Sequence, residues 1–262
     1  MVEAGVIIVL AVGLVLIKKE NTWSKISYLH FGLFGLILNS INIYTWGWTQ
    51  LINWEIIHGG VWNFSALFAS LQWNDLSFLQ GISPWWITSG LRFCYNGGYL
   101  CMILIPAVPC FVRGDFLQGW RYVLSGHILQ SILIIPLLLL FSVQEIWWVK
   151  HIPDGLNRNF TNGIDMLKTS YNCFPSMHTS MAAAMLIVGL KEKDQYFKFG
   201  WSLYCLLVIL STVYFPIHWV LDVIAGILFG WISSKVGCSL AEKVMSLINY
   251  IWGKKNKIVK EF

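Results

Sequence analysis

Long apolar runs separated by short polar connections dominate this chain. A membrane-spanning helix needs about 20 mostly apolar residues, and the matching runs lie at roughly 2–17, 26–46, 91–112, 122–143, 177–190, 199–217 and 218–235. The first run is short, and its positive charges follow it instead of preceding it, so we interpret it as a retained anchor rather than a cleavable signal peptide. The pattern predicts an all-α, polytopic membrane helix bundle.

A tryptophan-rich stretch interrupts this pattern between the second and third runs. Residues 46–86 read "WGWTQLINWEIIHGGVWNFSALFASLQWNDLSFLQGISPWW" and contain no Lys or Arg. Such a density of Trp is typical of the headgroup region of a bilayer, so we predict interfacial helices here. The alternative is a further span through residues 56–74, which would invert the orientation of everything before it. Hydropathy alone does not exclude that alternative.

Composition agrees with the membrane class. Hydrophobic residues make up 56% of the 262 residues and charged residues only 12%, which excludes an ordinary soluble domain of this length. The formal charge of +5 gathers in short connections and in the tail "GKKNKIVK", so it indicates membrane orientation rather than nucleic-acid binding. The six cysteines form no CxxC pair, so neither a zinc motif nor a disulfide framework is indicated.

The Lys and Arg residues fall unevenly on the two sides of the predicted membrane. If the connection after the first run is cytoplasmic, counting spans places 14 of the 18 Lys and Arg residues on that side and 4 on the other. The positive-inside rule favours this orientation. It predicts a cytoplasmic C-terminal tail and places the long connection between residues 143 and 177 on the non-cytoplasmic side.

Two short motifs combine titratable side chains with membrane segments. The stretch "CFPSMHTSMAAAM" places Ser176 and His178 at the start of an apolar helix, where free N–H groups and the helix dipole form an anion site. In "STVYFPIHWVLDVIAGILFG", His218 and Asp222 have i, i+4 spacing, so the carboxylate can orient the imidazole. Ionisable residues within membrane segments indicate function because burying them is costly.

The number of intervening spans brings the two histidines to the same membrane face. Helix ends separated by two spans return to one side, so His178 and His218 can meet. Two histidines that flank an anion site, one of them oriented by a carboxylate, suit phosphoryl transfer: one attacks phosphorus and the other protonates the leaving oxygen. The alternative is a structural role for either histidine.

These residues resemble a known family. "PSMH" is similar to the P-S-G-H motif, and "STVYFPIHWVLD" to the S-R-x5-H-x3-D motif, of the type 2 phosphatidic acid phosphatase superfamily. The resemblance covers about residues 90–236 and implies a six-helix membrane core that needs no metal or other cofactor. It also implies that His218 forms a phosphohistidine, that Asp222 orients it, that His178 is the general acid and that Ser176 helps to hold the phosphate.

The chain departs from the family motifs at one glycine and at several cationic positions. Met177 replaces the motif glycine, Thr212 replaces the motif arginine, and no intact K-x6-R-P motif is present. The branch that resembles inositol phosphorylceramide synthase and sphingomyelin synthase also lacks that arginine. Our candidate phosphate ligands are Arg158, Lys150, Lys168 and Thr212, although each basic residue has the alternative of an ordinary solvated loop charge.

We therefore predict one integral membrane domain, residues 1–262. Its parts are N-terminal helices (1–46), an interfacial segment (47–90), a catalytic helix core (91–236) and a cytoplasmic basic tail (237–262). Glycines in "GILFG" and the small residues of "SMAAAM" predict close helix packing within the bundle.

The predicted function is cleavage of a lipid phosphoester at the non-cytoplasmic face. The expected partners are a membrane lipid phosphate or phospholipid as substrate and water or an alcohol as acceptor, with no nucleic acid. One alternative is a phospholipid head-group phosphotransferase that uses an alcohol acceptor. Another is a non-catalytic lipid-binding or transport protein. The sequence leaves the head group and the oligomeric state open.

Overall fold

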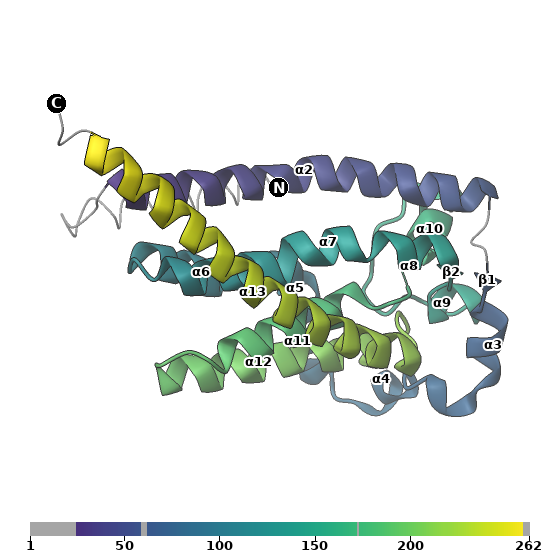
Figure 1. Cartoon of the computed structure of the whole chain (residues 1–262). Helices are drawn as coiled ribbons and strands as arrows, with labels where there is room; N and C mark the ends of the chain where they lie inside the picture. Colours follow the sequence, from purple (N-terminus) through teal and green to yellow (C-terminus); the bar gives the residue numbers. More distant parts are fainter. Residues whose placement is uncertain (1–24, 59–61, 172, 259–262) are drawn as a thin grey trace.

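The computed structural model describes residues 25–58, 62–171 and 173–258. In these ranges the chain is built from helices, and its extended segments are two short strands, β1 (Trp62–Asn63) and β2 (Phe141–Ser142). The strands pair in parallel, with Trp62 opposite Phe141. Figure 1 shows the helices packed as one elongated bundle. The predicted all-α bundle is confirmed.

The helices follow one another with short connections. Their bounds are α2 (Lys25–His58), α3 (Ser65–Ser70), η1 (Gln72–Asn74), α4 (Phe78–Ile82), α5 (Trp85–Val112), α6 (Phe116–Val123), η2 (Leu124–Ile128), α7 (Leu129–Leu133), α8 (Ile135–Leu140), α9 (Ile146–Val149), α10 (Gly163–Ser170), α11 (Met177–Gly189), α12 (Gln195–Tyr214) and α13 (Val220–Ile258).

Several of these helices are long and apolar enough to cross a membrane. Three stretches qualify in the described residues: Phe116–Leu140, Gln195–Tyr214 and Val220–Trp252. The two parts of α5, bent by 60° after Gly98, qualify together as a fourth, and the bend follows a pair of glycines, a common cause of kinks. These helices make the chain a multi-pass membrane protein.

The predicted spans compare with these helices as follows. The spans at 122–143, 199–217 and 218–235 each correspond to one of the three stretches, and 91–112 corresponds to the bent pair. Those at 26–46 and 177–190 correspond to shorter apolar helices, Ser27–Ile37 and Met177–Gly189. The run at 2–17 lies outside the described residues.

Two helices continue beyond the membrane spans predicted from their apolar runs. Helix α2 continues to His58 instead of ending near 46, and α13 continues to Ile258 instead of ending near 235. Neither extension contains a proline, so nothing in the sequence stops the helix at the end of its apolar part. The alternative span through residues 56–74 is not formed, because β1, α3 and η1 divide that segment.

Helix α11 is the centre of the bundle around the two motifs. It packs against α13, α12 and α5, and its residues from Thr179 to Met185 are buried. A side chain at Gly226 of α13 would place its Cβ 2.7 Å from the carbonyl oxygen of Ser176, and one at Gly230 would lie 2.9 Å from the Cβ of Ala183. The predicted close packing through small residues is confirmed.

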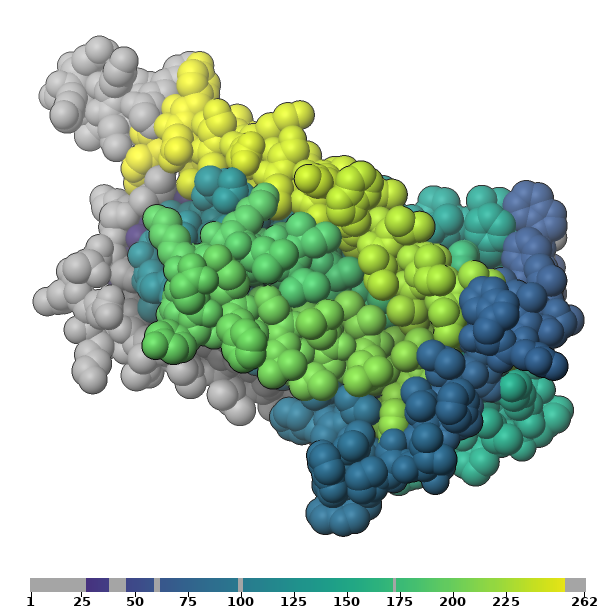
Figure 2. Space-filling view, turned by 90° about the horizontal axis from the view of Figure 1, so that it is seen from below, coloured from purple at the N-terminus to yellow at the C-terminus, as the bar shows by residue number. Residues whose placement is uncertain are grey.

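The tryptophan-rich segment covers the end of the bundle where α13 begins. Figure 2 shows α11 and α12 in green beside yellow-green α13, with the blue segment around α3 and α4 at that end. The buried Asn74 side chain accepts a hydrogen bond from the Leu221 N–H (2.9 Å) and donates one to the Phe68 carbonyl (3.1 Å). One amide thereby ties this segment to the first turn of α13.

Candidate active site

The start of α11 is fixed by Ser176. Its buried hydroxyl is the N-cap of the helix and accepts a hydrogen bond from the Thr179 N–H (3.4 Å). Its own backbone N–H donates to the carbonyl oxygen of Asp222 (3.2 Å). Because Gly226 allows close approach, the N-terminus of α11 is attached to the first turn of α13. The helix dipole therefore points its positive end at the residues of the second motif.

His178 lies one residue into the same helix. Its ring stacks on the ring of Tyr95 from α5, with centroids 4.3 Å apart and planes inclined by 20°. It interacts electrostatically with His218 and, more weakly, with Arg158. The Ser176 N–H bond to the Asp222 carbonyl places the start of α11, which holds His178, against the turn that holds His218, on the one side of the bundle that the span count predicted.

Asp222 and His218 meet at the turn that leads into α13. Asp222 is fully buried, and its Oδ2 lies 3.7 Å from Nδ1 of the His218 ring. The same oxygen accepts the Trp219 N–H at 2.8 Å. Since α13 begins only at Val220, this turn rather than a shared helical face sets the pairing. The 3.7 Å separation is an ion-pair contact longer than a hydrogen bond, so a small movement of the ring would let the carboxylate accept the Nδ1 proton, and Nε2 lies on the opposite side of the ring.

Cys173, in the loop between α10 and α11, also contacts His218 and Asp222. Its thiol donates to Asp222 Oδ2 (2.8 Å), and its Sγ lies 3.9 Å from His218 Nδ1. Burial, followed by the nearby Asp222 carboxylate, raises the pKa of the Cys173 thiol well above its ordinary value, so the protonated form donates this bond. Sequence reasoning missed this contact because Cys173 is 49 positions from Asp222 and belongs to no cysteine motif.

Arg158, the first candidate phosphate ligand, is held by two carboxylates. Its Nε donates to Asp154 Oδ2 (2.8 Å), and its Nη2 donates to Glu145 Oε2 (2.7 Å). The guanidinium also lies 5.4 Å from the ring centres of Trp147 and Phe160. The positive charge of Arg158 acts on His178. However, Glu145 and Asp154 fix the orientation of the guanidinium and offset its charge.

The backbone places this arginine cluster beside the His218 turn. The Trp147 N–H donates to the Pro216 carbonyl (2.8 Å), and the Glu145 N–H donates to the Ser170 carbonyl (2.8 Å). Glu145 is almost fully buried, so its charge depends on Arg158 for compensation. Glu145 and Asp154 were not expected from the sequence: Glu145 is 13 positions from Arg158, and Asp154, although four positions away, lies with it in a loop rather than on a predicted helix.

The other candidate phosphate ligands lie in three different settings. Lys150 forms an ion pair with Asp75 at a cavity of about 730 Å³ that Pro216 also lines. Lys168 lies in the last turn of α10, without an ion pair to any residue of the described part of the chain. The buried Thr212 hydroxyl bonds to the hydroxyl of Thr179 (3.0 Å), and its carbonyl accepts the His218 N–H (3.3 Å). Thr212 therefore connects the start of α11, through Thr179, to the turn that holds His218.

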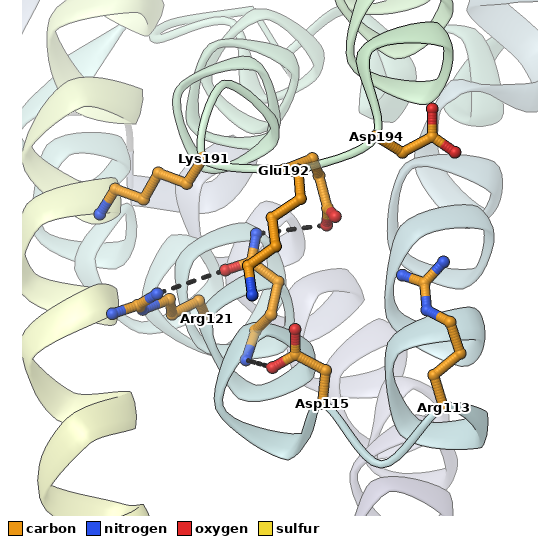
Figure 3. A pocket seen from close by; sticks show the side chains of 8 residues that line it. Arg113, Asp115, Arg121, Lys191, Glu192 and Asp194 are labelled. Carbon is orange, nitrogen blue, oxygen red and sulfur yellow. Dashed lines mark hydrogen bonds between the residues drawn. The ribbon is translucent and has the colours of Figure 1, made fainter.

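A separate charged cavity lies at the other end of α11. It has a volume of about 390 Å³ and lies between the α5–α6 and α11–α12 turns. In Figure 3, Arg121 and Lys191 lie on one side of it and Arg113 on the other. The Glu192 carboxylate accepts hydrogen bonds from the Gln118 side-chain amide (3.3 Å) and from the Tyr122 hydroxyl (2.9 Å). This cavity is distant along α11 from both histidines, so it is not part of the candidate active site.

The candidate site residues predicted from the sequence all lie in one segment that is similar to a known family. Residues 128–245 match the PAP2 superfamily. The PAP2 match covers less than half of the 262 residues and includes every candidate site residue predicted from the sequence. No curated protein and no solved structure gives a significant match to the chain. The match does not distinguish the branch that resembles inositol phosphorylceramide synthase from the rest of the PAP2 superfamily.

Proposed function

We propose that this chain is a PAP2-type lipid phosphatase or phosphotransferase that works through a phosphohistidine on His218. One observation carries the proposal: the capped start of α11, which holds His178, lies against the turn into α13 that holds His218 and Asp222. The PAP2 match over the same residues supports it.

The proposed reaction has two steps. His218 Nε2 attacks phosphorus, the bond from phosphorus to the lipid oxygen breaks, and His178 donates a proton to that oxygen. Water or an alcohol then gives its proton to His178 and attacks phosphorus, the N–P bond breaks, and His218 is restored. Asp222 stabilises the positive charge on the His218 ring in both steps, and the N-terminal dipole of α11 and Ser176 hold the phosphate oxygens.

The pairing of Arg158 with two carboxylates favours a lipid substrate whose phosphate carries a single negative charge. A phosphomonoester carries nearly two negative charges near neutral pH and a phosphodiester carries one, so a monoester needs more cationic donors to offset desolvation. In this chain Thr212 occupies the position of the motif arginine, and Arg158 is already paired with Glu145 and Asp154. We therefore propose head-group transfer from a phosphodiester lipid to an alcohol, as in the branch that resembles inositol phosphorylceramide synthase.

A comparison of donors tests this preference. Purified protein in lipid vesicles is supplied with phosphatidate, an isoprenyl phosphate or a diester phospholipid, each with and without an alcohol acceptor, and the products are measured by mass spectrometry. Diester turnover that depends on the alcohol is the expected result. Rapid hydrolysis of monoesters with no diester turnover would instead make the chain a simple lipid phosphatase. A chain that only binds or transports lipid would turn over none of these donors.

The active site is proposed to face the non-cytoplasmic side, on the basis of the 14 to 4 distribution of Lys and Arg. A single cysteine at Asn162, in a background without native cysteines, should react with an impermeant thiol reagent added to intact cells. A single cysteine at Asp194, on the turn between α11 and α12, should not react. The opposite labelling pattern would place the histidines in the cytoplasm.

A further inference from the structure

Three different metal-ligating atoms converge inside the candidate active site. Cys173 Sγ lies 2.8 Å from Asp222 Oδ2 and 3.9 Å from His218 Nδ1, and Oδ2 lies 3.7 Å from Nδ1. In the described residues this is the one group of three or more His, Cys, Asp or Glu side chains with such proximity. Tetrahedral zinc, with bonds of about 2.0–2.3 Å, places its ligand atoms about 3.3–3.6 Å apart. Small side-chain movements would therefore bring the three atoms to zinc distances.

The charges of this group also suit a divalent cation. A Cys173 thiolate and the Asp222 carboxylate together carry two negative charges, so a bound divalent ion leaves a cluster with no net charge, which lowers the cost of burying it. Asp222 Oδ1 is buried and has no hydrogen-bond partner in the described part of the chain. It is placed to supply a fourth ligand from the same carboxylate.

The ligand types select which cation binds. Thiolate and imidazole prefer zinc and similar borderline ions, whereas magnesium and calcium prefer oxygen ligands. The group has one sulfur, one nitrogen and carboxylate oxygens, so we expect zinc to bind and magnesium not to bind. No sequence motif indicated this group, because Cys173 is 45 positions from His218 and the two meet only when α11 packs on α13.

We propose that Zn²⁺ binds Cys173, His218 and Asp222 and that this binding inhibits the enzyme. Zinc replaces the thiol proton, which goes to solvent, and takes the Nδ1 lone pair of His218. The ring proton then resides on Nε2, and the Nε2 lone pair is no longer available to attack phosphorus. Asp222 is diverted from the ring to the metal. The inhibition rests on the proposed function, whereas the binding does not.

Binding is measured without any assay of activity. Cobalt(II), a spectroscopic substitute for zinc, is added to the purified full chain, and a thiolate-to-cobalt charge-transfer band in the near ultraviolet reports a Cys–metal bond. The band is expected in the wild type and should disappear when zinc is added. Cys173→Ser should abolish it, and Asp222→Asn, which preserves side-chain shape, should weaken it. Cys101→Ala is the matched control, because Cys101 belongs to no metal-ligating group in the described residues, and it should retain the band.

Inhibition is then measured on the donor that the wild type turns over best. Zinc should inhibit and a chelator should reverse the effect, whereas magnesium should have no effect. Each variant is compared with its own activity without metal. Cys173→Ser should raise the zinc concentration for half inhibition by more than about 100-fold, since even the loss of an outer-shell partner costs about 10- to 100-fold in affinity.

The two measurements separate the possible failures. No cobalt band in the wild type, or a band that persists in folded Cys173→Ser protein, would overturn the zinc site. A zinc-displaceable band in a protein that turns over no donor would uphold the metal site and count against the proposed function. Equal zinc inhibition of the wild type and Cys173→Ser would overturn this site as the cause of inhibition.

Discussion

Replacing His218 with alanine is expected to abolish turnover of every lipid phosphoester while the helix bundle remains folded. The change removes the proposed nucleophile, and loss of a nucleophile from a covalent mechanism costs on the order of 10⁶-fold in rate. The backbone contact that positions the turn, from the His218 N–H to the Thr212 carbonyl, does not involve the imidazole and remains possible. Steady-state turnover on the best donor is the measurement.

His58→Ala is the matched control for this variant. His58 lies at the exposed end of α2, and its ring bonds to the Trp54 carbonyl of the same helix. Its replacement should leave turnover within about twofold of wild type, as expected for a surface change away from the site. Near-normal turnover by a well-folded His218→Ala protein would exclude His218 as the nucleophile.

Replacing His178 with alanine is expected to slow the first step by about 10²- to 10⁴-fold, the usual contribution of general acid catalysis. The loss should depend on the leaving group. A lipid alkoxide needs a proton as it leaves, whereas a nitrophenolate does not, so the burst of nitrophenol from an activated phosphoester should be nearly unchanged. Rapid-quench measurement of both donors gives the two rates. Equal losses for both donors would assign His178 a structural role, through its stacking on Tyr95.

The parts of the fold that the sequence predicted are those determined by local patterns. Apolar runs marked the spans, and the glycines of "GILFG" marked where α13 approaches α11, because both are properties of consecutive residues. The predicted spans did not locate the ends of α2 and α13. Both helices continue beyond their apolar parts because no proline stops them, and hydropathy does not report where a helix ends outside the membrane.

In the candidate site, too, the residues in short motifs were predicted from the sequence, and the contacts between distant residues were not. Ser176, His178, His218 and Asp222 were identified because each lies in a short motif with a chemical meaning. The bond from Cys173 to Asp222 and the enclosure of Arg158 by Glu145 depend on how the long connection folds against the His218 turn. Single residues far apart in sequence carry no periodicity, so these contacts required the tertiary structure.

Trapping the covalent intermediate tests the role of His218 most directly. The enzyme is quenched during turnover of a donor whose phosphorus is radiolabelled, and the labelled peptide is identified by mass spectrometry. The mechanism predicts an acid-labile, alkali-stable label on the peptide that contains His218, absent from His218→Ala and chased away by the acceptor. Label on a different residue, or an actively turning enzyme that carries no label at all, would contradict a phosphohistidine at His218.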